Sequence, residues 1–193
     1  AFIEIKNLSK SYPKRSDALF KNGTAEFIFQ NISLTIQQGE KIALLGNSGC
    51  GKTTFGKCLV QLEKADGGQI IYQQSDLTTM KKTDLQKIRP RFQMIFQDAY
   101  QSLNPKLSIG SAIGEVLKIQ QGISKREVQK QTEMLLEQVK LDAHLFSRKP
   151  YQLSGGQRRR AVIARALAAR PEFLIADEPG SGLDETVKRD IFN

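Results

Sequence analysis

The stretch GNSGCGKT, from Gly46 to Thr53, restricts the possible folds of this chain more than any other feature. It fits the pattern of glycine, four residues, glycine, lysine and threonine that forms a phosphate-binding loop between a strand and a helix. Glycines permit the positive φ angles that turn successive N–H groups inward, and the following helix adds its positive end. A glycine-rich turn with a chance lysine is the alternative, but it does not explain the flanking patterns. The loop therefore predicts a nucleotide site.

Both flanks of the loop fit that prediction, because the apolar run KIALL (41–45) precedes it and a helical pattern (51–62) follows it. Lys52 would reach the β- and γ-phosphates of ATP, and the Thr53 hydroxyl would ligate Mg²⁺. We interpret Cys50 as a small spacer, with a reactive thiol as the alternative. The predicted nucleotide-binding residues of this segment are Gly46, Asn47, Ser48, Gly49, Cys50, Gly51, Lys52, Thr53 and Thr54.

The order of apolar patterns predicts an α/β fold. FIEIKNLSKSY (2–12) and NISLTI (31–36) alternate apolar and polar residues, so we expect an antiparallel β subdomain at the N-terminus. RFQMIF (91–96) is a further strand, and FLIA (173–176) is a continuous apolar run typical of a central parallel strand. We therefore expect a phosphate-loop NTPase fold with a mostly parallel core sheet.

The segment 98–150 is interpreted as an inserted α-helical subdomain. SAIGEVLKIQQ (111–121) is helix-like and is stopped by Gly122. A second helix begins at Ser124, where Ser124 and Glu127 have capping-box spacing. The expected parts are 1–97, the ATP-binding core with its β subdomain; 98–150, the helical subdomain; and 151–193, the rest of a core that is incomplete at its end.

Two carboxylates follow the apolar run, in the sequence FLIADEP (173–179). They lie where a buried strand emerges at its carboxyl edge, which is the usual place for ligands in open α/β sheets. Asp177 suits Mg²⁺, directly or through water, and Glu178 would polarise a water aimed at the γ-phosphate. The alternative is that the two residues are solvated carboxylates at a helix start, and the nearby phosphate loop disfavours this alternative.

The stretch YQLSGGQRRR (151–160) contains a second glycine motif, LSGGQ (153–157). It can expose N–H groups at the start of an alanine-rich helix, with Ser154 as cap or hydroxyl donor. By itself the motif fits an ordinary capped helix start equally well. Together with GNSGCGKT and ADE (176–178), it resembles the ATP-binding-cassette (ABC) transporter ATPases, and the resemblance covers residues 2–193.

This resemblance explains why one chain would contain two phosphate-binding motifs. In that family two ATPase domains pair head to tail, and the LSGGQ segment of one closes on the ATP held by the phosphate loop of the other. Each site is incomplete until a second ATPase subunit, identical or related, has paired, so hydrolysis is coupled to closure. The residues that the resemblance assigns to the partner's nucleotide are Ser154, Gly155, Gly156 and Gln157.

The resemblance also assigns roles to three isolated residues. Gln97 matches the Q-loop glutamine, which contacts the metal region and links to the helical subdomain facing a transporter partner. Asp184, in SGLD (181–184), matches the D-loop residue at the dimer seam. Tyr12 matches the aromatic residue that stacks on adenine, with a core aromatic as the alternative. The predicted Mg²⁺ ligands are then Thr53, Gln97 and Asp177, and the predicted catalytic residues are Lys52, Gln97 and Glu178.

The chain departs from the family pattern at two points. Arg159 stands where glutamine is common, and we expect it to add charge near the partner's nucleotide. The family's switch histidine lies beyond the D-loop, so this residue and the last core strands are expected beyond Asn193. His144 precedes LSGGQ and cannot take that role.

The segment FQDAYQSLNP (96–105) resembles the dipeptide, oligopeptide and nickel importer branch of the family, with a plain asparagine-proline loop as the alternative. The resemblance implies the ATPase subunit of a bacterial importer, peripheral on the cytoplasmic face of the membrane. Its partners would be a second ATPase subunit, membrane permease subunits and, indirectly, an extracytoplasmic substrate-binding protein. Cargo would not touch these residues.

Composition leaves two rival functions to weigh. The formal net charge of +9 fits nucleic acid, an anionic membrane face or nucleotide phosphates. An ABC-type ATPase of nucleic-acid repair would insert long coiled coils, whereas 98–150 is short and lacks sustained heptads, so we expect no nucleic-acid partner. The other rival is a non-hydrolysing regulator, which the presence of both Lys52 and Glu178 disfavours.

The remaining composition excludes several classes of protein. Two cysteines and one histidine do not form a zinc pattern and fit a reduced cytoplasmic setting. No apolar run is long enough to cross a bilayer, and the first residues do not resemble a secretory leader. We therefore expect a globular nucleotide-binding protein without a membrane span.

Overall fold

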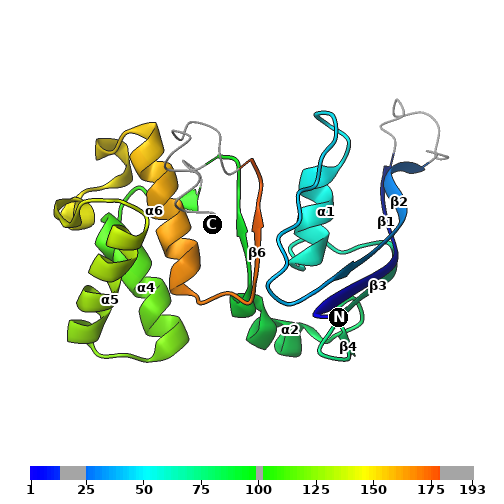
Figure 1. Ribbon diagram of the computed structural model, residues 1–193, viewed down its shortest axis with the longest axis horizontal. Helices are drawn as coiled ribbons and strands as arrows, with labels where there is room; N and C mark the ends of the chain where they lie inside the picture. The colour runs from blue at the N-terminus through cyan, green and yellow to red at the C-terminus, as the bar shows by residue number, and fades with distance from the viewer. Residues whose placement is uncertain (14–24, 99–101, 179–193) are drawn as a thin grey trace. The chain divides into compact units, whose positions relative to one another are not determined.

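The computed structural model describes residues 1–13, 25–98 and 102–178, and its contacts divide the chain into two compact units, Ala1–Arg89 and Pro90–Asn193. The first unit contains an antiparallel sheet, and the second contains a parallel strand pair with helices (Figure 1). The predicted α/β class is thereby confirmed. The predicted part boundaries after residues 97 and 150 stay predictions.

The sheet of the first unit is antiparallel throughout. Its strands are β1 (Ile3–Pro13), β2 (Ala25–Ile36), β3 (Gly67–Tyr72) and β4 (Ser75–Asp76), in the spatial order β2-β1-β3-β4. Ile3 pairs with Ile36 on one side and with Tyr72 on the other, and all three side chains are buried. The alternation at the start of the chain therefore places one face in the core, and the predicted antiparallel β subdomain is confirmed.

Helix α1 (Lys52–Leu59) follows the glycine loop, as predicted, and packs on β2. Its Phe55 ring meets the Phe29 ring edge-on with centroids 5.4 Å apart, a favoured aromatic geometry that fixes the helix against the strand. Helix α2 (Lys82–Ile88) and the 3-10 turn η1 (Arg89–Arg91) come later along the chain. The sequence patterns do not reveal α2, because it buries no residue and so has no apolar periodicity.

The run KIALL does not form the expected buried strand. Residues 41–45 carry no strand assignment, and Leu45 is 88% exposed. A strand needs a hydrogen-bonded neighbour, and no strand in the described ranges pairs with this segment. The expectation of a buried strand at 41–45 is therefore wrong, because apolar composition alone does not supply a pairing strand.

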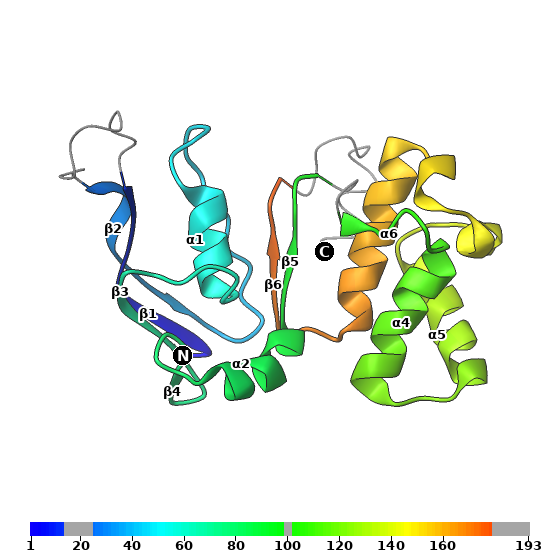
Figure 2. The ribbon, with the colours of Figure 1, turned by 180° about the vertical axis from the view of Figure 1, so that it is seen from behind.

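The second unit contains a parallel pair of strands. β5 (Phe92–Ile95) and β6 (Phe173–Ala176) lie side by side, with Phe92 opposite Phe173 (Figure 2). The parallel direction predicted for FLIA is confirmed, although its side chains are half-buried rather than fully covered. Helix α6 (Gly155–Ala168) packs against the pair, and Ile95 and Ala164 belong to one buried cluster.

The rest of this cluster comes from the predicted helical segment. Helices α4 (Ile109–Gln121) and α5 (Lys125–Gln138) pack with α6, and the 3-10 turns η2 (Ala143–Ser147) and η3 (Pro150–Gln152) lead into it. Gly122 ends α4 in the left-handed conformation, with φ 61°, and Ser124 caps α5 by accepting the Glu127 N–H at 3.4 Å. Both predicted helix boundaries are confirmed. In the described ranges, every helix is too short or too polar to traverse a bilayer.

One arginine of the YQLSGGQRRR stretch lies inside this core. The Arg158 side chain is only 3% exposed. Its Nε and Nη2 donate to the Pro150 carbonyl at 3.0 and 2.9 Å, and Nη2 also donates to the Leu153 carbonyl at 3.1 Å. Arg158 therefore fixes the segment before α6 to the helix and is not placed to bind a phosphate.

Replacing Arg158 with methionine should destabilise the fold. The substitution keeps an unbranched chain but removes the donors, so two buried carbonyls lose charge-assisted hydrogen bonds, a cost of about 2–3 kcal/mol. The measurement is urea unfolding followed by circular dichroism. Arg165→Met, on the exposed face of the same helix, is the control, with an expected change within about 0.5 kcal/mol. Equal urea midpoints for the two variants would contradict the anchoring role.

Candidate functional site

The glycine loop approaches the sheet of the first unit closely at Gly51. Gly49 and Gly51 have φ angles of 81° and 94°, in the left-handed region that side chains disfavour. A Cβ added to Gly51 would lie 2.6 Å from Ile28 Cγ2 on β2. Both the backbone angle and the close approach of the strand therefore require glycine at residue 51, the position from which α1 starts.

The start of α1 presents positive charge. Gly51 is the N-cap and supplies no side chain, and the first turn contains no acidic residue. Lys52 Nζ donates to the carbonyl oxygens of Gly46 and Asn47 at 2.7 and 2.8 Å, so its ammonium lies within the curve of its own loop. The start of α1, with its helix dipole, and the Lys52 ammonium thus lie together at one exposed loop, which is an arrangement that can bind a phosphate chain.

Tyr12 lies beside the first turn of the same helix. Its hydroxyl donates to the Glu63 carboxylate, which is the largest cause of the raised pKa of Tyr12. A hydrogen bond with Thr54 acts to lower the Tyr12 pKa, and this bond requires the two side chains to be neighbours. The Lys10 ammonium, held by Asp66 at 3.1 Å, sits 5.2 Å from the ring centroid. Tyr12 is 40% exposed, so part of its ring remains accessible to a flat ligand.

The acidic strand end and the Q-loop residue meet in the second unit. The Asp177 N–H donates to the Ile95 carbonyl at 2.9 Å, which continues the β5–β6 ladder by one residue. Gln97 Nε2 donates to Glu178 Oε2 at 2.7 Å. Two predicted catalytic residues from distant parts of the sequence are therefore in direct contact at the carboxyl edge of the parallel pair.

The LSGGQ segment forms a fully capped start of α6. Ser154 Oγ accepts the Gln157 N–H at 3.2 Å, and Gln157 Oε1 accepts the Ser154 N–H at 2.9 Å. This is a capping box with glutamine at its third helical position. Ser154 and Gly155 are exposed, and a Cβ added to Gly155 would meet no atom within 4 Å. The outer face of this helix start is therefore open to an approaching molecule.

Arg159 turns toward its own chain. It is 7% exposed, and its Nη2 donates to the backbone carbonyl of Glu178 in the same chain. Burial lowers the pKa of the Arg159 guanidinium, while the charge of Glu178 acts to raise it. The expectation that Arg159 adds charge near the partner's nucleotide stays a prediction. In the sequence, Arg159 stood out only because glutamine is common at this position in the family. The residue type did not indicate that its side chain turns toward its own chain.

The residues predicted to ligate Mg²⁺ offer a hydroxyl, an amide oxygen and a carboxylate, which are the hard ligands this ion prefers. Thr53 belongs to the first unit, whereas Gln97 and Asp177 belong to the second. Within the described residues, no three His, Cys, Asp or Glu side chains gather into a metal-binding group. Because Mg²⁺ in NTPases is held by one or two protein ligands together with substrate phosphates, this donor set fits the ion.

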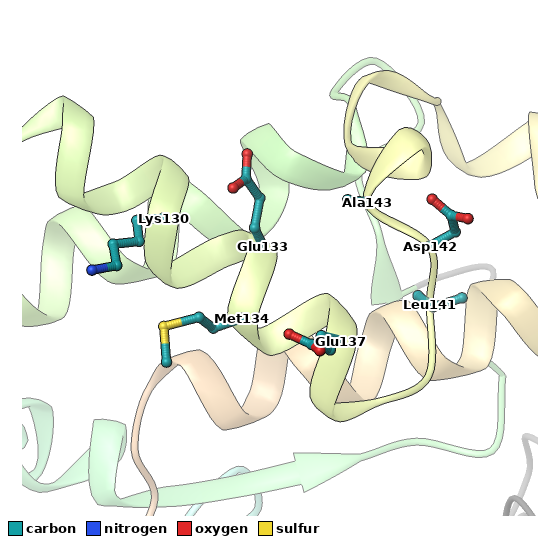
Figure 3. A pocket seen from close by; sticks show the side chains of 7 residues that line it. All are labelled: Lys130, Glu133, Met134, Glu137, Leu141, Asp142 and Ala143. Carbon is teal, nitrogen blue, oxygen red and sulfur yellow. The ribbon is translucent and has the colours of Figure 1, made fainter.

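A pocket of about 410 Å³ lies on α5 and the segment that follows it, and it shares no residue with the predicted site (Figure 3). Its lining includes Lys130, Glu133, Met134 and Glu137.

The predicted D-loop residue Asp184 lies outside the described residues. The predicted site residues therefore fall into two groups: the loop with Tyr12 in one unit, and Gln97, Glu178 and LSGGQ in the other.

Comparison with known proteins identifies relatives of the whole chain. The protein-family model for ABC transporters matches residues 29–181. The chain is 37% identical to the "Probable peptide ABC transporter ATP-binding protein y4tS" of Sinorhizobium fredii over 193 residues, which are 100% of this chain and 55% of that protein. It is 36% identical to the "Oligopeptide transport ATP-binding protein AppF" of Bacillus subtilis, over 99% of this chain and 58% of the relative. The chain thus spans little more than half the length of these relatives.

A solved structure shares the fold. It is described as the dimeric structure of a post-hydrolysis state of the ATP-binding cassette MJ0796 bound to ADP and Pi. The TM-score is 0.86 at 29% identity, over 98% of this chain and 79% of that one.

The two cysteines should react very differently with an alkylating reagent. Cys50 is exposed in the glycine loop, whereas Cys58 is buried in α1, and burial raises the pKa of its thiol to about 11. Because the thiolate is the reactive form, native protein treated with iodoacetamide at mildly alkaline pH should be modified at Cys50 only, as read by peptide mass spectrometry. Both residues should react in urea, which is the control. Equal labelling of Cys58 in the native protein would contradict its burial.

Proposed function

This chain belongs to the ABC transporter family, and from that premise we propose that it is the ATPase part of a bacterial importer subunit that drives uptake of peptides. It would bind ATP, pair with a second ATPase subunit and act on permease subunits at the cytoplasmic face of the membrane. The observation that carries the proposal is the Lys52 ammonium, which lies within the curve of the glycine loop at the start of α1. The peptide importers among its relatives favour peptide cargo over nickel.

The glycine loop is proposed to hold the triphosphate. When ATP enters, its phosphate oxygens would replace the Gly46 and Asn47 carbonyls as acceptors for Lys52. The adenine ring would stack on the exposed face of Tyr12, near the first turn of α1. Mg²⁺ bound with the nucleotide would neutralise charge on the β- and γ-phosphates, with Thr53, Gln97 and Asp177 as its protein ligands.

The open start of α6 is proposed to complete the site of a second subunit. The Ser154 hydroxyl accepts the Gln157 N–H and retains its own hydrogen for donation. The exposed Gly155 after it lets a phosphate group approach the helix end, whose dipole favours negative charge. Support comes from the related cassette, whose structure is dimeric. Asp184 of the D-loop would lie along the same seam.

Glu178 is proposed to prepare the attacking water. Its carboxylate would accept a hydrogen bond from the water, whose oxygen attacks the γ-phosphorus as the bond to the bridging oxygen breaks. ADP leaves with that electron pair, and the water's proton passes to the carboxylate or to phosphate. The Gln97 amide, at 2.7 Å, would orient the carboxylate. The related cassette bound to ADP and Pi supports the same reaction for this chain.

Replacing Glu178 with glutamine in the full-length protein should lower ATP turnover by about 100- to 10,000-fold, because the water loses its base. ATP binding should survive, so the variant should accumulate as a nucleotide-bound dimer in size-exclusion chromatography with ATP. Glu172→Gln is the control, since this exposed glutamate of the same unit bonds Arg91 at 3.5 Å instead. Turnover near the unmodified level in Glu178→Gln would refute the assigned role.

Purification from membranes should recover permease subunits with the protein. The physical reason is that an importer ATPase transmits closure through a stable contact with its membrane partner. Detergent extraction, affinity capture of the full-length protein and mass spectrometry provide the measurement. Recovery of DNA or RNA instead, lost steeply as salt is raised, would indicate the nucleic-acid function and contradict the importer proposal.

A further inference from the structure

The Arg159 side chain connects α6 to the end of β6 within one subunit. Its Nη2 donates to the Glu178 carbonyl across 19 positions of sequence. Arg159 is 7% exposed as a residue, and its contact with the exposed Glu178 is a partly buried, charge-assisted hydrogen bond. The neighbouring arginines contact other carbonyls: Arg158 contacts Pro150 and Leu153, and Arg160 contacts Lys140 at 2.8 Å.

The Glu178 backbone is in a conformation that needs support. Its φ is 48°, in the left-handed region that non-glycine residues seldom adopt. Such conformations persist only where the surroundings hold them, and they cluster at active sites. Arg159 holds the carbonyl of this residue, and Gln97 holds its carboxylate at 2.7 Å. Glu178 is thus fixed at both its main chain and its side chain, by groups from two different elements.

We propose that Arg159 is a positioning residue for ATP hydrolysis, which holds the Glu178 main chain so that the carboxylate can meet the attacking water. This inference rests on the proposed function, because it assigns Arg159 to the reaction carried by Glu178. Arg159 itself touches no nucleotide. It acts only through the residue whose carbonyl it binds.

The position of Arg159 also gives the contact a second role. Arg159 follows Ser154 by five residues on one helix, about 7.5 Å along the helix axis. The start of α6 is proposed to bind the nucleotide of the partner subunit, whereas Glu178 serves the nucleotide of its own subunit. Helix α6 therefore contains both the segment proposed for the partner's nucleotide and the residue that holds the base for its own.

The test compares Arg159→Met, Arg159→Lys and a matched control, Arg160→Met, in the full-length protein. Methionine keeps an unbranched chain but cannot donate a hydrogen bond, whereas glutamine could. Arg159→Met should lower kcat by about 100-fold, the usual penalty for a misplaced reacting group, while the KM for ATP stays unchanged. Arg159→Lys should recover part of that loss, because the ammonium retains the charge and a donor. Arg160→Met should keep the unmodified kcat, because its contact is with the Lys140 carbonyl.

Two further measurements separate positioning from a general structural role. In a Glu178→Gln background, Arg159→Met should cause no additional loss of turnover, because the two residues act as one unit. Amide hydrogen exchange at Asp177 and Glu178 should rise in Arg159→Met and stay unchanged in Arg160→Met. A kcat for Arg159→Met equal to that of Arg160→Met, or a parallel loss of kcat, ATP affinity and melting temperature, would overturn the proposal.

The hydrogen-exchange measurement also separates failure of this inference from failure of the proposed function. If the unmodified protein does not hydrolyse ATP, the proposed function fails, and with it any catalytic use of Arg159. Faster exchange confined to Asp177 and Glu178 in Arg159→Met would still establish that this side chain holds the Glu178 backbone. Unchanged exchange there would remove the positioning role as well.

Discussion

The first N–H groups of a helix have no intrahelical partner, and the two glycine motifs of this chain meet that constraint in opposite ways. Helix α1 begins at Gly51, which offers no side-chain cap, and Lys52 is the nearest charge. Helix α6 begins at Ser154, where a capping box satisfies both reciprocal donors. The positive end of α1 therefore favours an external anion at the first motif. The second motif pairs the Ser154 and Gln157 N–H groups with its own side chains and offers an open outer surface to a partner.

The α1 site depends on the antiparallel sheet that supports it. Ile28 approaches residue 51 so closely that only glycine fits, and the Phe29–Phe55 ring contact fixes the helix on the same strand. Strand β2 therefore packs against the end of the phosphate loop at Gly51. Glycine is needed there both for the positive φ angle and for the close contact with Ile28. Tyr12, on the neighbouring strand, reaches the first turn of α1 from the side.

The three arginines after LSGGQ show how one helix can serve several purposes. Arg158 fixes the preceding turn, Arg159 reaches the end of β6, and Arg160 binds the end of the α5 segment. Each guanidinium supplies several donors in a fixed fork, so each can bind backbone carbonyls of segments that precede or follow the helix. A run that suggests phosphate binding in the sequence therefore stabilises the surroundings of the carboxylate instead.

The sequence alone determined the local features of this protein. Glycine spacing placed the loop at 46–53, Ser124 and Gly122 marked helix ends, and the apolar run FLIA indicated a parallel strand, because each depends on short-range geometry. Tertiary structure alone decided which groups meet across long distances. Gln97 reaches Glu178 across 81 positions, Arg159 turns into the core, and KIALL has no strand partner in the described ranges. Side-chain direction and strand pairing depend on neighbours that the fold brings together, and no local pattern encodes them.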